Sequence, residues 1–247
     1  MNIPPALAGL LVSRDGKLAE PARKWLDCSF FAVLFSLFLT GLAIPLAVQC
    51  FKLPFVVALF LPQIIQGGLL VCLLLLLDRH VAPRVKLMLF TPNPFPVFLL
   101  VKTLFMLLFS TIILSTAVMN LAKLAGITLP PQPLTVFLAK ATPFQIAAIS
   151  FSAVIVAPVL EEWAFRRIIF GKFATLLSCP AAMILTSLLF SMMHGNILHA
   201  PSLFLMGMIL QWIMRRTSSL FCPVLLHAAF NFINIMMILL ARNYPVS

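Results

Sequence analysis

Long apolar segments separated by short polar connections fill most of this sequence, and they constrain its fold more than any other feature. A helix needs about 20 mostly apolar residues to cross a bilayer, so we predict an all-α, polytopic transmembrane helix bundle of about seven spans with short interfacial helices. Two of the segments are short for a span, which indicates tilt or a thinned bilayer. The expected spans cover residues 28–48, 54–77, 95–120, 144 to the glutamates at 161–162, 181–194, 200–214 and 220–240.

The composition agrees with a membrane protein. The chain is 62% hydrophobic and 9% charged, with a mean hydropathy of +1.13, which is not the composition of a soluble domain. The net charge is +11, but the 17 Lys and Arg are scattered in twos and threes between apolar segments. Membrane topology explains this pattern better than a nucleic-acid-binding patch. We therefore predict the lipid bilayer as a partner and no nucleic acid.

The positive residues also predict an orientation. With seven spans and the N-terminus inside, twelve of the 17 Lys and Arg fall on the inner side and four on the outer side, with Lys102 set aside as membrane-embedded. The positive-inside rule then favours a cytoplasmic N-terminus. The first residues lack the pattern of a removable signal peptide. We expect a protein integral to the plasma membrane, of a prokaryotic cell.

The sequence divides into four parts. They are a polar tail with an interfacial helix over residues 1–27, N-terminal transmembrane helices with a connecting loop over 28–143, a core over 144–240 and a C-terminal tail over 241–247. Gln63 and Gln66, followed by two glycines, indicate that the second span packs one face on another helix. The five cysteines are odd in number and dispersed, so they indicate neither a disulfide framework nor a zinc cluster.

Two adjacent glutamates lie inside the apolar segment that begins near residue 144. Glu161 and Glu162 are the only acidic residues after Asp78, and an ionised side chain near the bilayer centre costs about 2.5–3.5 kcal/mol or more. Glu162 and Arg166 are four residues apart and share a helix face, as an ion pair requires. Glu161 is rotated by about 100° from Glu162 and has no obvious local partner. We interpret Glu162 and Arg166 as a structural pair and Glu161 as the carboxylate left for chemistry; the alternative is a single packing network of all three.

Polar side chains recur in two later apolar segments. The segment 181–194 ends in Phe190-Ser-Met-Met-His194, and the segment 220–240 carries His227 and Asn231 on one helix face. A single intramembrane histidine most often serves an interhelical hydrogen bond. At about 1.5 Å per residue, Glu161 and His227 both reach the inner half of the membrane, whereas His194 lies deeper unless its span tilts.

Together these groups resemble the three motifs of the CPBP family of intramembrane proteases, the CAAX proteases and bacteriocin-processing enzymes, also called the Abi family. The similarity covers about residues 144–240. Its three patterns are Glu161-Glu162-x-x-x-Arg166, Phe190-x-x-x-His194 and His227-x-x-x-Asn231.

The chain departs from the family pattern at two places. Arg167 follows the motif arginine where glycine is common, and Thr217-Ser218-Ser219 stands where Thr-Gly-Ser is common. Neither departure touches a proposed catalytic group.

The resemblance implies a glutamate-type, metal-independent endopeptidase without a cofactor. Glu161 would be the general base, and His194 would help to hold and activate the same water. His227 and Asn231 would donate hydrogen bonds to the oxyanion. Glu162, Arg166 and Phe190 would support them. The implied substrate is a membrane-associated peptide or protein tail, lipidated or not, cleaved from the cytoplasmic side.

Three alternatives use the same residues differently. Glu161, His194 and His227 could bind zinc, although no His-Glu-x-x-His helix is present. Intramembrane Glu and His are also typical of proton-coupled transporters, for which no inverted repeat is visible. The third alternative is a catalytically silent scaffold or immunity protein that uses the same fold to bind another membrane protein.

Overall fold

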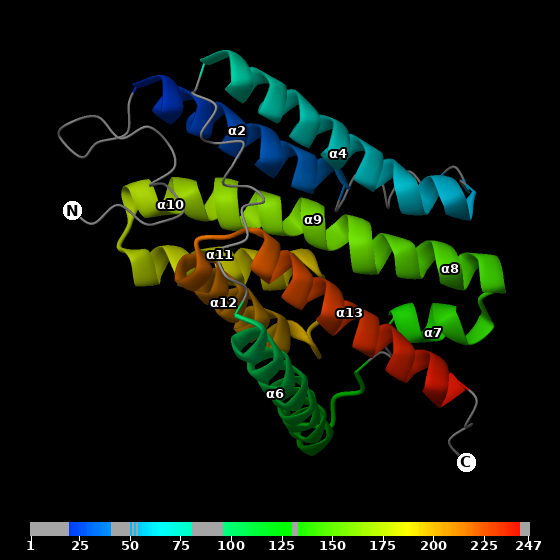
Figure 1. Cartoon of the computed structure of the whole chain (residues 1–247). Helices are drawn as coiled ribbons and strands as arrows, with labels where there is room; N and C mark the ends of the chain where they lie inside the picture. The colour runs from blue at the N-terminus through cyan, green and yellow to red at the C-terminus, as the bar shows by residue number, and fades with distance from the viewer. Residues whose placement is uncertain are drawn as a thin grey trace.

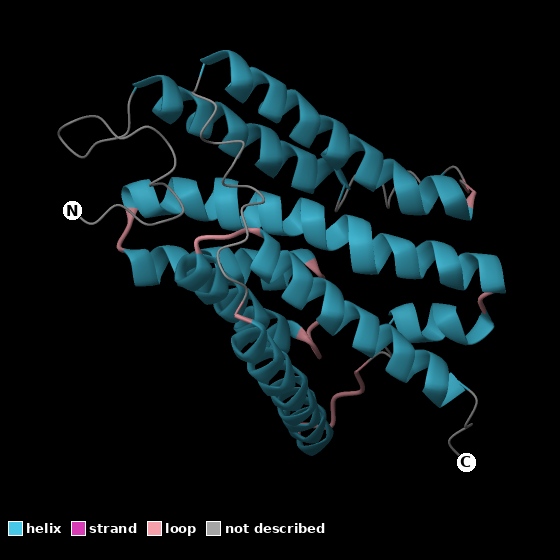
Figure 2. Ribbon diagram, viewed as in Figure 1, coloured by secondary structure: helices cyan, strands magenta, loops and turns pink. Residues whose placement is uncertain are grey.

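The computed structural model describes residues 20–40, 50, 52, 54–80, 96–129 and 133–242, and helices form nearly all of this part of the chain (Figure 2). Three helical stretches, Val97–Leu124, Pro143–Leu176 and Phe221–Arg242, are long and apolar enough to cross a membrane. Val56–Cys72 and Cys179–Met193 are shorter apolar helices. The predicted all-α integral membrane fold is therefore confirmed, while the number of seven spans stays a prediction.

One continuous helical run forms the centre of the bundle (Figure 1). It consists of α8 (Pro143–Phe151), the π-helical segment η2 (Ser152–Val156), α9 (Ala157–Glu162), the π-helical segment η3 (Trp163–Ile169) and α10 (Phe170–Leu176). We expected a span that leaves the membrane soon after the glutamates, whereas the helix continues to Leu176. A buried apolar cluster around Phe165, Phe170 and Phe190 packs this run against its neighbours.

The other helices surround this run (Figure 1). On one side, α2 (Glu20–Phe38) and α4 (Phe55–His80) lie next to each other and contact η2, α9 and η3. On the other side, α13 (Phe221–Arg242) runs along η2 and α9. The remaining helices are α6 (Val97–Leu124), α7 (Pro133–Lys140), α11 (Cys179–Met193) and α12 (Ala200–Thr217). Of these, α11 and α12 pack on each other, and α6 contacts α12 and α13.

The first described helix begins earlier than the first expected span. The expected boundary at residue 28 between tail and span falls inside α2, which begins at Glu20 and carries Asp27 within it. The Asp27 carboxylate accepts a hydrogen bond from the Lys172 ammonium of α10, so this charge joins two helices. The connection before residue 144 contains a short helix, α7, and its interfacial placement stays a prediction. Most of the tail over 1–27 and of the connection over 78–93 lies outside the described residues.

Close packing joins α11 to α12. A Cβ atom added to Gly207 of α12 would lie 2.9 Å from the Cβ of Ser187 on α11, which is closer than Cβ atoms approach other atoms in proteins. Small residues allow membrane helices to approach in this way without a large side chain between them. The loop between these two helices carries His194, so this contact fixes the helix that ends at the proposed site.

Candidate active site

The predicted ion pair between Glu162 and Arg166 is confirmed. Arg166 donates from Nε to Oε2 of Glu162 at 2.7 Å and from Nη2 to Oε1 at 3.3 Å, and both side chains are fully buried. The guanidinium also lies 5.0 Å from the ring centroid of Phe190, within the range of a cation–π contact. Both charges are thus neutralised inside the protein, which a buried ionic group requires.

His227 extends this pair toward Glu161. Its Nδ1 lies 3.0 Å from Oε1 of Glu162. Because the Glu162 carboxylate already accepts from Arg166, we assign the proton to His227 Nδ1, which then donates to Glu162. The other ring nitrogen, Nε2, lies 4.0 Å from Oε2 of Glu161. The buried Glu162 carboxylate therefore fixes the orientation of this imidazole, because the hydrogen bond at one ring nitrogen determines where the other nitrogen points.

His194 reaches the same oxygen from another helix. It follows the last residue of α11, and its Nδ1 lies 2.7 Å from the carbonyl oxygen of Phe190. A carbonyl only accepts, so Nδ1 carries the proton and Nε2 is left facing Glu161 Oε2 at 4.0 Å. The next residue, Gly195, turns the chain with φ +60°, a left-handed conformation that glycine adopts without strain.

Glu161 Oε2 lies between these two imidazoles without a direct partner. The atom is buried and makes no hydrogen bond within the described part of the chain, while about a quarter of the side chain, 26%, is exposed. A separation of 4.0 Å is too long for a direct hydrogen bond. A water at about 2.8 Å from both Oε2 and one Nε2 would subtend an angle of about 90° between them, near the angle between the two O–H bonds of water. The geometry therefore fits a water held between base and imidazole.

Asn231 is bonded to the backbone of the central run, and its predicted role as an oxyanion donor stays a prediction. Its Nδ2 donates to the backbone carbonyl of Ala153 in η2 at 2.8 Å. The amide carries a second N–H that this bond does not use. The structure thus brings Glu161, His194 and His227 together, and it places Asn231 one turn further along α13 against the backbone of η2.

Phe190 lies at the centre of the site residues. It is fully buried, and its ring centroid lies 4.8 Å from that of His194, 5.9 Å from that of His227 and 5.2 Å from that of Phe165. One aromatic ring thus lies next to both imidazoles and carries the Arg166 guanidinium on its face.

Sequence reasoning missed the contribution of η2. Gln63 of α4 donates to the hydroxyl of Ser152, and Asn231 bonds the next residue, Ala153. The pattern of Gln63 and Gln66 predicted packing on another helix but not which one. The sequence feature that could have indicated η2 is Pro158, because proline lacks an N–H and disturbs the regular hydrogen bonds of a helix shortly before the glutamates.

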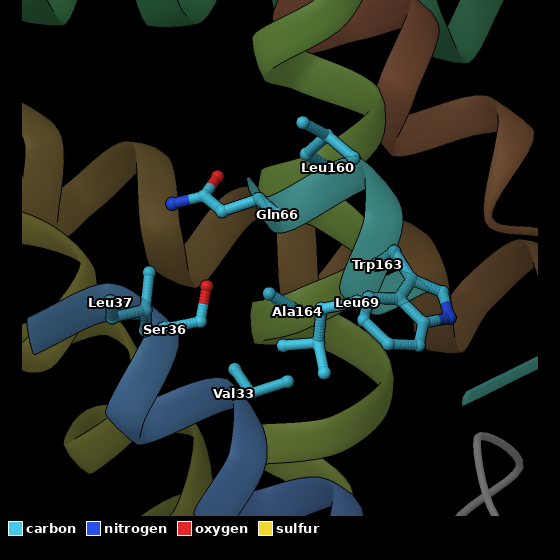
Figure 3. Close-up of a pocket in the computed structure, with 8 residues that line it drawn as sticks. All are labelled: Val33, Ser36, Leu37, Gln66, Leu69, Leu160, Trp163 and Ala164. Atoms are coloured by element: carbon cyan, nitrogen blue, oxygen red, sulfur yellow. The ribbon is translucent and has the colours of Figure 1, made fainter. Parts of the chain in front are cut away.

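One small cavity, of about 20 Å³, lies between the central run and the helices α2 and α4 (Figure 3). Side chains of α2 and α4 line it together with Leu160, Trp163 and Ala164. Its lining includes neither glutamate and neither histidine, so it is separate from the site. Among the described residues, no group of three or more His, Cys, Asp or Glu is arranged to bind a metal ion.

Comparisons with known proteins match the part of the chain that carries this site. Residues 143–233 match the family model described as "Type II CAAX prenyl endopeptidase Rce1-like". The chain is also 33% identical over 91 residues to the Bacillus subtilis (strain 168) protein named "Putative membrane peptidase YdiL". That alignment covers 36% of this chain and only 37% of the relative's length. No solved structure matches the chain.

The fold and site define a helical integral membrane protein with a buried cluster of two glutamates, an arginine and two histidines. Residues 143–233 are an Rce1-like segment, consistent with the resemblance to the CPBP family. At the level of the family, the two matches support a membrane protease.

Proposed function

We propose that this protein is an intramembrane endopeptidase in which Glu161 activates a water molecule to hydrolyse a peptide bond. One observation carries the proposal: a buried Glu161 oxygen, without a hydrogen-bond partner in the described part of the chain, lies 4.0 Å from the Nε2 atoms of two histidines on two other segments. Placing a carboxylate without a partner in an apolar bundle costs free energy, so such a residue is a candidate for a functional group.

The proposed reaction begins with the water between Glu161 and His194. The water donates one hydrogen to Glu161 and the other to His194 Nε2, so its lone pairs are free to attack the peptide carbonyl. Glu161 takes the proton as the new C–O bond forms, and it then gives that proton to the amine as the C–N bond breaks. The second hydrogen of the water stays on the new carboxyl group, so one water is consumed and a carboxylic acid and an amine are released.

The oxyanion of the intermediate needs donors that are already in place. His227 can donate from Nε2 only as an imidazolium, because its Nδ1 proton is given to Glu162. In that form the cluster would carry two positive charges, on Arg166 and His227, beside the two carboxylates of Glu161 and Glu162. A neutral cluster is the form that a low-dielectric site favours. The second N–H of Asn231 is the other proposed donor.

The substrate class follows from the setting of the site. We propose a membrane-associated peptide or protein tail that reaches Glu161 from the cytoplasmic side, the side on which the inner positive residues place the N-terminus. Prenylated tails are one candidate set, because the matching family model is described as a CAAX prenyl endopeptidase.

The test is a comparison of peptide termini in membranes from cells that express the wild type or Glu161→Ala at equal levels. Termini that appear only with the wild type identify the substrate and support the proposal, and identical sets of termini would refute it. The cleavage assay is then repeated with a zinc chelator. Loss of activity that zinc restores would replace the proposed scheme with the metal-dependent alternative.

His194→Ala is expected to lower kcat for the identified peptide by about 10²-fold or more, because the water loses one of its two acceptors. Single-turnover rates in detergent or bicelles measure this effect. Met192→Ala, which truncates an exposed neighbour on the same turn of α11, is the control and should leave kcat unchanged. A His194→Ala rate within a factor of three of the wild type would contradict this role.

Asn231→Ala is expected to lower kcat by about 10²-fold with a smaller change in KM, since an oxyanion donor acts mainly in the transition state. Asn234→Ala is the matched control, because Asn234 lies three residues on in α13 and donates only to the Phe230 carbonyl of its own helix, at 2.7 Å. An effect of Asn231→Ala on KM alone would argue against the oxyanion role.

A further inference from the structure

The segment η2 lies where the helix before Glu161 departs from its regular hydrogen bonds. The N–H of Ala157 bonds the carbonyl of Ser152, five residues back, instead of that of Ala153. The residue that would serve Ala153 in this wider pattern is Pro158, which has no N–H. The carbonyl of Ala153 therefore needs a donor from outside the helix.

Two neighbouring helices hold η2 from opposite sides. On one side, Asn231 of α13 donates to the carbonyl of Ala153 at 2.8 Å. On the other side, Gln63 of α4 donates to the hydroxyl of Ser152, a buried side chain. Two consecutive residues of η2 are thus bonded to different helices, which restrains the segment in rotation as well as in position.

The rotation of η2 determines which side chain faces the histidines. A π-helical turn absorbs one extra residue, so everything after it is turned by about 100° relative to a regular helix. If η2 became regular, the place of Glu161 beside His194 and His227 would pass to Leu160. Adjacent residues on this helix differ by this same angle, so a change of one residue in register replaces a carboxylate with an aliphatic side chain.

We propose that Gln63 is a positioning residue which, through Ser152, holds η2 in the register that turns Glu161 toward the two histidines. The effect on turnover rests on the proposed peptidase function, whereas the effect on register does not. Gln63 is 98 residues before Glu161 in the sequence and belongs to the part of the chain that the family match does not cover.

The first measurement is turnover of the identified peptide. Gln63→Leu and Ser152→Ala are each expected to lower kcat by about 10- to 100-fold with little change in KM, as a misplaced catalytic group does. The double variant should be no worse than either single variant, because both remove the same bond. Ser152→Thr, which keeps the hydroxyl, should recover most of the activity.

Gln66→Leu is the matched control. Gln66 lies one turn after Gln63 on α4, but it donates to Thr40 before α4, at 2.8 Å, and not to the central run. The same substitution on the same helix should therefore leave kcat within a factor of three of the wild type. Thermal unfolding in detergent confirms that all of these variants are folded.

The second measurement reads the register without catalysis. In a chain whose five native cysteines are replaced by serine, Glu161→Cys and Leu160→Cys are labelled with a water-soluble thiol reagent. Position 161 should react and position 160, only 7% exposed, should not. Adding Gln63→Leu should lower labelling at 161 and raise it at 160, while adding Gln66→Leu should change neither.

The two measurements separate the two proposals. Unchanged labelling at both positions in the Gln63→Leu background would overturn the positioning role, whatever the turnover. Exchange of labelling between 161 and 160 supports the positioning role even if no peptide is cleaved by the wild type, a result that would refute only the peptidase function.

Discussion

Replacing Glu161 with glutamine is expected to lower kcat for peptide cleavage by about 10³-fold or more. A positioned general base contributes about 10²- to 10⁴-fold to a rate. The amide of glutamine has nearly the same shape as the carboxylate but cannot take a proton from water. Glu161 Oε2 makes no hydrogen bond within the described structure, so the substitution breaks no hydrogen bond of that atom there.

The measurement is a single-turnover rate with the peptide identified by the membrane comparison. Binding of that peptide to Glu161→Gln should stay close to wild type, because the loss falls on the chemical step. The thermal unfolding midpoint is the control for folding. A variant that is folded, binds substrate and turns over within a factor of ten of the wild type would rule out Glu161 as the base.

Replacing Arg166 with methionine is expected to cost about 3–5 kcal/mol of stability, because it leaves a buried carboxylate without its cation. Glu162 and Arg166 are both fully buried, and Glu162 would retain only the bond from His227. The same change should abolish activity, since His227 is oriented by that carboxylate. Reversible unfolding in mixed micelles, followed by circular dichroism, measures the free energy of unfolding.

A second substitution separates the charge from the packing. Glu162→Leu combined with Arg166→Met removes both charges, and replacing a whole buried ion pair by apolar side chains is often nearly neutral for stability. The double variant should therefore recover most of the lost free energy but no activity. Arg216→Met, at an exposed arginine near the end of α12, should change stability by less than about 0.5 kcal/mol. A cost below about 1 kcal/mol for Arg166→Met would show that Glu162 is not held by this pair.

The sequence was sufficient to identify the partner of one of the two glutamates. Residues four apart on a helix meet whatever surrounds them, so the partner of Glu162 could be identified from spacing alone, and the structure confirms it. The same argument left Glu161 without a partner. Spacing could not say what else would approach it, because His194 and His227 lie 33 and 66 residues further along the chain.

Asn231 shows what motif spacing leaves open. The motif places it one helical turn from His227 on the same helix face and implies a donor to the oxyanion, but it names no partner within the protein. The structure gives its amide to the carbonyl of Ala153, because Pro158 leaves that carbonyl without a donor. A local defect in one helix thus determined the partner of a side chain on another.

The sequence by itself determined the helices, the membrane setting and the Glu162–Arg166 pair, because each depends on residues that are close along the chain and on the cost of polar groups in lipid. Only the tertiary structure decided that two imidazoles converge on Glu161 and that Gln63 and Asn231 hold the π-helical turn before it. Those contacts depend on how helices from distant parts of the chain rotate and pack against one another. No spacing within a single segment encodes that rotation.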